Sequence, residues 1–102
     1  MAREQSIGSV DQIPEGEGRV FDLGGQKIAV FRTRAGSVFA VQPNCPHRNG
    51  PLANGLLGTD TLVCPLHDRT FDLGTGRAIG HDDCLRTYPV RLELDGSVLI
   101  VG

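Results

Sequence analysis

The sequence contains little of what a membrane span or a nucleic-acid-binding surface needs. Its 102 residues include no tryptophan, one tyrosine and four phenylalanines. No apolar run approaches the roughly 20 residues that a membrane-spanning helix requires. Ten lysines and arginines stand against twelve aspartates and glutamates, so the formal net charge is −2 and no cationic surplus is available for a phosphate backbone. We therefore expect neither a membrane span nor a nucleic-acid partner.

The length and the first residues predict a single cytoplasmic domain. A chain of 102 residues provides material for one hydrophobic core, so residues 1–102 are expected to form one domain. The opening segment, MAREQSIGSVDQIPEGEG, has neither the apolar stretch nor the small-residue cleavage site of a signal peptide.

Helix-forming windows are also scarce, because Gly or Pro interrupts nearly every stretch long enough for three helical turns. The fourteen glycines favour short strands joined by turns. The runs 18–23 and 26–32 flank Gly24-Gly25, a pair typical of a two-residue hairpin turn, and residues 37–41 are expected to extend the meander. The sequence therefore predicts an all-β, antiparallel framework.

The C-terminal end carries a second hairpin signal. Val90, Leu92 and Leu94 alternate with charged residues, which predicts a half-buried strand. Asp95-Gly96 then predicts a turn into a strand over residues 97–101.

The middle of the chain has a different composition. Residues 42–60, QPNCPHRNGPLANGLLGTD, are rich in Pro, Gly and Asn and are expected to form a loop that contributes little to a core. A brief β-like run at 61–64, a second loop at 65–68, a run at 70–73 and a turn at 74–76 follow. Loops of this length in a compact domain are usually functional.

Two short motifs in this region combine a cysteine and a histidine. Cys45-Pro46-His47 and Cys64-Pro65-Leu66-His67 are separated by sixteen residues. Each proline-containing turn can direct a thiolate and an imidazole into one site, so the two turns together predict a four-ligand metal centre. The alternative is a coincidence of two buried cysteines with two surface histidines.

Two thiolates and two imidazoles suit either tetrahedral zinc or a [2Fe-2S] cluster in which two histidines bind one iron. Common zinc fingers hold the two cysteines in one turn and the two histidines in another, whereas here each turn carries one of each. Two facing loops that each send one cysteine to one iron and one histidine to the other would explain this mixing. A structural zinc module used for protein interaction remains the alternative.

The residues around these motifs resemble those of the soluble Rieske-type [2Fe-2S] proteins. The resemblance rests on CPHR at 45–48, CPLH at 64–67 and FDLGTG at 71–76, and it extends over nearly the whole chain. It implies a β-sandwich framework with a small cluster-binding subdomain of two loops, at about residues 42–80. It also implies that Cys45 and Cys64 hold the buried iron and that His47 and His67 hold the outer iron.

Within this family, the stretch CLRTYPV at 84–90 most resembles the small subunit of NAD(P)H-dependent assimilatory nitrite reductase. The ferredoxin components of aromatic-ring dioxygenases are a close second. Both resemblances imply a one-electron carrier that works between redox protein partners, a reductase and a terminal oxidoreductase or large subunit, with no substrate site of its own.

The remaining candidates receive simpler interpretations. Cys84 is expected to be a small buried apolar residue, and His81 a solvated turn residue. With two histidines assigned to the cluster, His81 alone cannot provide the two histidines of a second, oxygen-activating iron site. Four apolar residues are expected either to pack around the cluster or to form a small docking surface: Pro46, Pro51, Leu52 and Leu66.

Overall fold

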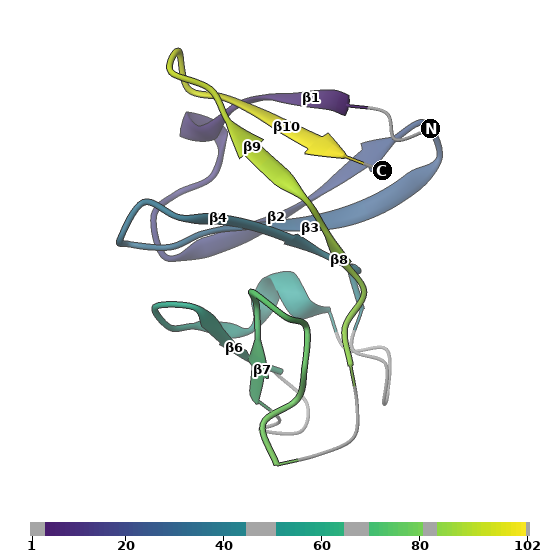
Figure 1. Ribbon diagram of the computed structural model, residues 1–102, viewed down its shortest axis with the longest axis vertical. Coiled ribbons are helices and arrows are strands. Elements are labelled where there is room, and N and C mark those ends of the chain that lie inside the picture. The colour runs from purple at the N-terminus through teal and green to yellow at the C-terminus, as the bar shows by residue number, and fades with distance from the viewer. Residues whose placement is uncertain (1–3, 45–50, 65–69, 81–83, 102) are drawn as a thin grey trace.

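The computed structural model describes residues 4–44, 51–64, 70–80 and 84–101 (Figure 1). Within these ranges the chain forms ten short strands and two single-turn 3-10 helices, η1 (Val10–Gln12) and η2 (Leu52–Asn54). The strands are β1 (Glu4–Ser9), β2 (Glu17–Leu23), β3 (Gln26–Arg32), β4 (Val38–Val41), β5 (Leu56–Leu57), β6 (Thr61–Val63), β7 (Thr70–Asp72), β8 (Thr87–Tyr88), β9 (Val90–Leu92) and β10 (Ser97–Val101). Among the described residues no helix has the length and apolar character needed to cross a membrane.

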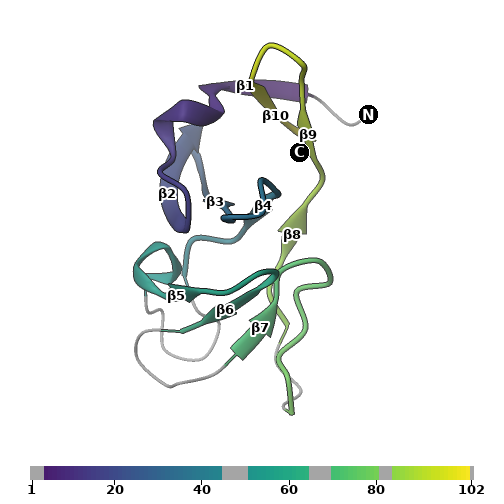
Figure 2. The same cartoon turned by 90° about the vertical axis from the view of Figure 1, so that its left-hand side faces the viewer.

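Two antiparallel sheets form a sandwich, as the sequence analysis predicted. One has the order β1-β10-β9 and the other β2-β3-β4-β8, and Figure 2 shows them facing each other across the upper half of the molecule. The core between them consists of Ile13, Ile28, Val30, Ala40, Val98 and Ile100, all at most 2% exposed. The apolar side chains of β3 and β10 therefore stabilise the sandwich by leaving water.

The predicted N-terminal hairpin is confirmed. β2 and β3 pair from Glu17↔Arg32 to Leu23↔Gln26, and Gly24 and Gly25 occupy the turn with φ of 65° and 94°. These positive values are ones that glycine adopts without strain, which explains why this pair ends one strand and begins the next.

The turn and the second strand of the predicted C-terminal hairpin are confirmed, but the predicted half-burial of its first strand is not. Asp95-Gly96 joins β9 to β10, with Gly96 at a φ of 90°. The predicted half-burial is wrong beyond Val90, because Leu92 is 45% exposed and Leu94 lies at the turn with a fully exposed side chain. This exposure accompanies the edge position of β9, which among the described strands pairs with β10 alone. β1 was not predicted, because its sequence EQSIGS lacks a clear apolar alternation.

A third sheet, with the order β5-β6-β7, lies beside the sandwich in the lower half of the molecule (Figures 1 and 2). Its inner side packs on residues of β3 and β4 through a second core of ten buried residues: Ala29, Phe31, Val41, Leu52, Leu62, Cys64, Phe71, Leu73, Ala78 and Leu85. The sheet is thus anchored to the back of the β2-β3-β4-β8 sheet.

The expectation that residues 42–60 form a loop is corrected by η2 and by β5, a strand of this third sheet. Residues 45–50 lie outside the described residues, but η2 and β5 follow them directly. Leu52 has no exposed surface and belongs to the second core, contrary to the prediction that this segment contributes little to burial. The Gly- and Asn-rich composition gave no indication that Leu52 would be buried or that Leu57 would pack against the same core.

Candidate metal centre

Of the four predicted ligands, the structure describes Cys64. Cys45, His47 and His67 lie outside the described residues, as does His81. Cys64 directly follows β6 and has no exposed surface. Because side chains alternate along a strand, Cys64 lies on the same, inner side as Leu62, and both belong to the core beneath the third sheet.

Backbone pairing brings together the two ends of each predicted ligand segment, residues 45–50 and residues 64–69. Asn44 and Pro51 form an antiparallel bridge, and the Leu52 N–H donates to the Pro43 carbonyl at 3.0 Å, so these contacts bring together the two ends of the 45–50 segment. Val63 pairs with Thr70 at the end of the β6–β7 ladder, which brings together the two ends of the 64–69 segment. Both candidate ligand pairs therefore lie in segments whose ends are held at fixed positions.

The bases of these two segments lie next to each other. Gly55 is so close to β6 that a Cβ atom there would overlap the Val63 carbonyl oxygen and lie 3.0 Å from Leu62 Cδ1. Leu52 and Cys64 share one buried core. The chain that leaves the first segment is thus packed against the strand that enters the second, which is the arrangement that two facing ligand loops require.

The burial of Leu52 decides between the two roles expected of it. It was one of four residues expected either to pack near the cluster or to contact a partner, and its complete burial assigns it to packing. Pro51 is exposed, and Pro46 and Leu66 lie outside the described residues.

The surroundings of Cys64 fit a [2Fe-2S] cluster. It belongs to a core of apolar residues that also contains Leu62, Phe71 and Leu85. Apolar side chains on this side exclude water. This suits a cluster held by two thiolates and two neutral imidazoles, because its reduction potential depends on solvent exposure and on the surrounding residues. Within the described ranges no group of three or more His, Cys, Asp or Glu residues is arranged to hold a further metal ion.

Cys84 lies in a different environment from the one predicted. It was expected to be buried, but its side chain is exposed, and its thiol donates a long contact of 3.6 Å to the Leu85 carbonyl. The physical reason is again alternation, because the next residue, Leu85, is only 2% exposed and occupies the inward position. Cys84 forms an isolated bridge with Arg77.

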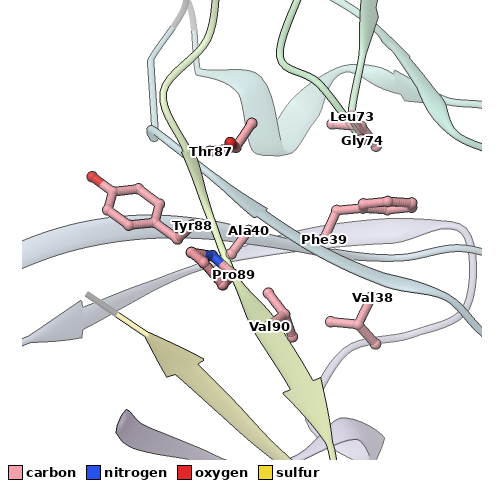
Figure 3. Close-up of a pocket in the computed structure, with 9 residues that line it drawn as sticks. All are labelled: Val38, Phe39, Ala40, Leu73, Gly74, Thr87, Tyr88, Pro89 and Val90. Carbon is pink, nitrogen blue, oxygen red and sulfur yellow. The ribbon is translucent and has the colours of Figure 1, made fainter. Parts of the chain in front are cut away.

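An apolar hollow of about 360 Å³ lies where the sandwich meets the third sheet. It is lined by residues 38–40 of β4, by Leu73 and Gly74, and by residues 87–90 (Figure 3). The hydroxyl of Tyr88 accepts a hydrogen bond from Gln26 Nε2 at 2.9 Å. Among the described residues that line it, Tyr88 alone has a titratable side chain.

The comparison with protein families decides between the two kinds of metal centre. Residues 3–89 match the model of the Rieske [2Fe-2S] domain. The chain belongs to the Rieske [2Fe-2S] family. A Rieske domain carries a [2Fe-2S] cluster, and this Rieske domain is accordingly an electron carrier. The zinc alternative is thereby overturned.

Three curated relatives differ in how much of their length the chain spans. It is 39% identical over 94 residues to the ferredoxin subunit of 3-phenylpropionate/cinnamic acid dioxygenase from Escherichia coli K12, covering 89% of this chain and 86% of that one. It is 36% identical over 88 residues to the biphenyl dioxygenase ferredoxin subunit from Pseudomonas sp. KKS102, covering 83% and 80%. It is 40% identical over 80 residues to the 4β-methylsterol monooxygenase of Methylococcus capsulatus, covering 68% of this chain but only 22% of that protein.

Solved structures share the fold over nearly the whole length. A Mycobacterium tuberculosis protein, named for the small subunit of an NADH-dependent nitrite reductase, superposes with a TM-score of 0.91 at 22% identity and covers 100% of this chain and 96% of its own. The ferredoxin from Sphingomonas yanoikuyae B1 superposes with a TM-score of 0.83 at 29% identity, covering 98% and 99%. A ferredoxin solved in complex with the oxygenase of carbazole 1,9a-dioxygenase gives a TM-score of 0.81 at 24% identity, covering 97% and 93%.

Proposed function

We propose that this Rieske domain is the ferredoxin component of an aromatic-ring dioxygenase system and passes single electrons from a reductase to an oxygenase. The observation that carries the proposal is the whole-length likeness to two dioxygenase ferredoxin subunits, at 39% and 36% identity, with 86% and 80% of those subunits covered.

We further propose that Cys45 and Cys64 bind one iron of the cluster and that His47 and His67 bind the other. Three observations support this assignment: the complete burial of Cys64, the closed bases of both ligand segments, and the packing of Gly55 against β6. When bound, the cluster accepts and releases one electron. The chain's part is to hold it at the end of the third sheet and to keep water from its Cys64 side.

A second candidate is the small subunit of an assimilatory nitrite reductase, to which the 84–90 segment is most similar. This candidate is compatible with the fold, since the M. tuberculosis protein named for such a subunit superposes with a TM-score of 0.91. The dioxygenase ferredoxin is the first candidate because those ferredoxin subunits resemble this chain in sequence, at 39% and 36% identity.

A cytoplasmic location stays a prediction.

Electron delivery separates the two candidates. The cluster-loaded chain is reduced and mixed in a stopped-flow instrument with the oxygenase component of the E. coli 3-phenylpropionate/cinnamic acid dioxygenase, or with the large subunit of an assimilatory nitrite reductase. We expect rapid reoxidation of the chain and reduction of the oxygenase in the first mixture. Electrons that reach only the nitrite reductase, or that reach neither protein, contradict the ferredoxin proposal.

The ligand assignment has its own test. Cys64→Ser is expected to lose iron and acid-labile sulfide, which the intact cluster contains at about two of each per chain. Cys84→Ser provides the matched control, because Cys84 is exposed and bridged to Arg77 rather than placed at a ligand segment. Full iron and sulfide in the Cys64→Ser protein would refute the assignment.

A further inference from the structure

A row of side chains crosses the outer face of the third sheet at the end nearest Cys64. Leu56 pairs with Val63, and Val63 pairs with Thr70. The Ile79 N–H donates to the Thr70 carbonyl at 2.8 Å, which continues the register of the neighbouring Phe71↔Ala78 bridge. Directly paired residues point to the same face, so Leu56, Val63 and Thr70 share one, and the hydrogen bond to Thr70 places Ile79 beside them at the start of a turn. These four residues are called here the outer row.

The two sides of this sheet are clearly distinguished by burial. The next row along the strands points inward and contains Leu62 and Phe71, which have no exposed surface, and Ala78, which is 7% exposed. In the outer row Leu56 is 76% exposed and Ile79 is 57% exposed, while Val63 and Thr70 are half-buried between them. The outer row therefore adds little to the core and leaves two large aliphatic side chains in water.

Polar residues border the outer row on the side away from Cys64. Two residues along the strands, and so on the same face, Thr61 pairs with Asp72, and the Asp72 N–H donates to the Arg77 carbonyl at 2.8 Å. An uncharged apolar line with a border of one acidic and one basic residue has the pattern of a small protein interface, with an apolar centre and a polar rim. Single exposed apolar residues are normal on any protein, but two at the ends of one continuous row are a patch.

The outer row lies next to Cys64, a proposed ligand of the cluster. Val63 is the residue before Cys64, and Thr70 closes the base of the second ligand segment. A protein seated on the outer row would therefore lie within one residue of a proposed cluster ligand. The row lies at the opposite end of the molecule from the β9–β10 turn, where the exposed Leu94 is found (Figures 1 and 2).

We propose that the outer row, formed by Leu56, Val63, Thr70 and Ile79, is the docking surface for the electron-accepting oxygenase component. The occupant is a protein that presents an uncharged apolar patch over its own redox centre and takes one electron as the reduced cluster returns to its oxidised state. The proposal rests on the proposed function, since it assigns the partner to that same centre. Electron-transfer contacts are typically small, so a row of this extent suffices for a transient complex.

The test replaces the two exposed aliphatic side chains with polar ones of similar length. Leu56→Gln, Ile79→Gln and the double variant are compared with Leu94→Gln, a control in which a fully exposed leucine is changed far from the row. The chain is loaded with its cluster and reduced, and its second-order rate of electron transfer to the oxygenase component of the E. coli 3-phenylpropionate/cinnamic acid dioxygenase is measured. Iron content, visible spectrum and reduction potential are measured for every variant.

We expect the double variant to lower the second-order rate roughly tenfold, because it removes both large aliphatic side chains of the docking surface at once, and a tenfold change corresponds to about 1.4 kcal/mol. Its iron content, spectrum and potential should match those of the wild type, because neither side chain belongs to the core. Leu94→Gln should transfer electrons at the wild-type rate. A potential that shifts in the double variant would show that the row acts on the cluster rather than on docking, and would overturn the proposal.

Two further outcomes separate this inference from the proposed function. A wild-type chain that passes electrons to the oxygenase, together with a double variant that passes them equally fast, refutes the outer row alone. A wild-type chain that passes none refutes the ferredoxin function. If gel filtration shows a wild-type dimer that the double variant converts to a monomer, the row is occupied by a second copy and the oxygenase assignment is wrong.

Discussion

Gly55 provides the sharpest test of how the candidate centre is built. Its backbone has a φ of −74° and a ψ of 169°, a conformation that alanine adopts without strain. Any effect of Gly55→Ala must therefore come from the added methyl group. That group would overlap the Val63 carbonyl oxygen and lie 3.1 Å from the Leu52 carbonyl oxygen. Both are backbone atoms, so the clash is relieved only if η2 moves away from β6.

Forcing one extra methyl group into a packed interior commonly costs about 1–3 kcal/mol. For a domain of this size each kcal/mol lowers the melting temperature by about 4–8 °C. We therefore expect Gly55→Ala to melt roughly 5–20 °C below the wild type. The displacement also reaches the residue before Cys64, so the variant is expected to retain less iron than the wild type when purified in parallel.

The matched control is Gly74→Ala in the turn after β7. There the nearest atom to an added Cβ is Asp72 Oδ1 at 3.2 Å, an exposed side-chain atom that accepts from the Gly74 and Thr75 N–H groups and needs to shift by only a few tenths of an ångström. We expect a change within about 0.5 kcal/mol, as for most exposed substitutions. Thermal unfolding followed by circular dichroism, with iron analysis of the same samples, measures both variants. A Gly55→Ala protein that melts and binds iron like Gly74→Ala would show that the absence of a side chain at residue 55 is not needed for the packing of η2 against β6.

Three further predictions follow from burial and charge. Maleimide should label Cys84 but not Cys64 in the folded protein, because the Cys84 thiol is exposed and the Cys64 thiol is buried. Peptide mass spectrometry identifies the labelled residue. Labelling of Cys64 would contradict its burial in the fold. Phe71→Ala should lower stability by about 3–5 kcal/mol through the cavity it leaves, and a melting curve equal to the wild type would be inconsistent with a side chain that has no exposed surface. The Ser97 backbone N–H lowers the pKa of Asp95, and the Ser97 side chain adds to this. The ionised carboxylate therefore stabilises the β9–β10 turn above the ordinary pKa, and this contribution is lost as the pH falls through the lowered value; an NMR titration that places the pKa of Asp95 at or above its ordinary value would contradict this.

Local turn chemistry made much of the sandwich predictable from the sequence. Gly24-Gly25 and Asp95-Gly96 each set the register of a hairpin, because positive φ values at these positions are available to glycine. β1 has no such signal. It is held by pairing with β10, a partner about 90 residues away, so the information that orders it is not local.

The candidate centre was predictable in its ligands but not in its support. Spacing alone pairs Cys45 with His47 and Cys64 with His67, since thiolates and imidazoles in two turns are metal-ligand patterns. The closeness of Gly55 to β6 has no sequence signal, because an Asn-Gly pair in a loop predicts only a turn. The exposure of Cys84 was missed for a related reason, since its outward direction is set by the burial of Leu85.

Electron-nuclear double resonance of the reduced, cluster-loaded protein with ¹⁵N-labelled histidine shows whether two histidines bind the cluster. We expect couplings from two histidine nitrogens to the paramagnetic cluster in the wild type. His47→Cys and His67→Cys should each remove one of them in any protein that retains its iron. A wild-type spectrum without histidine couplings, or a purified protein that contains zinc and no acid-labile sulfide, would contradict the account.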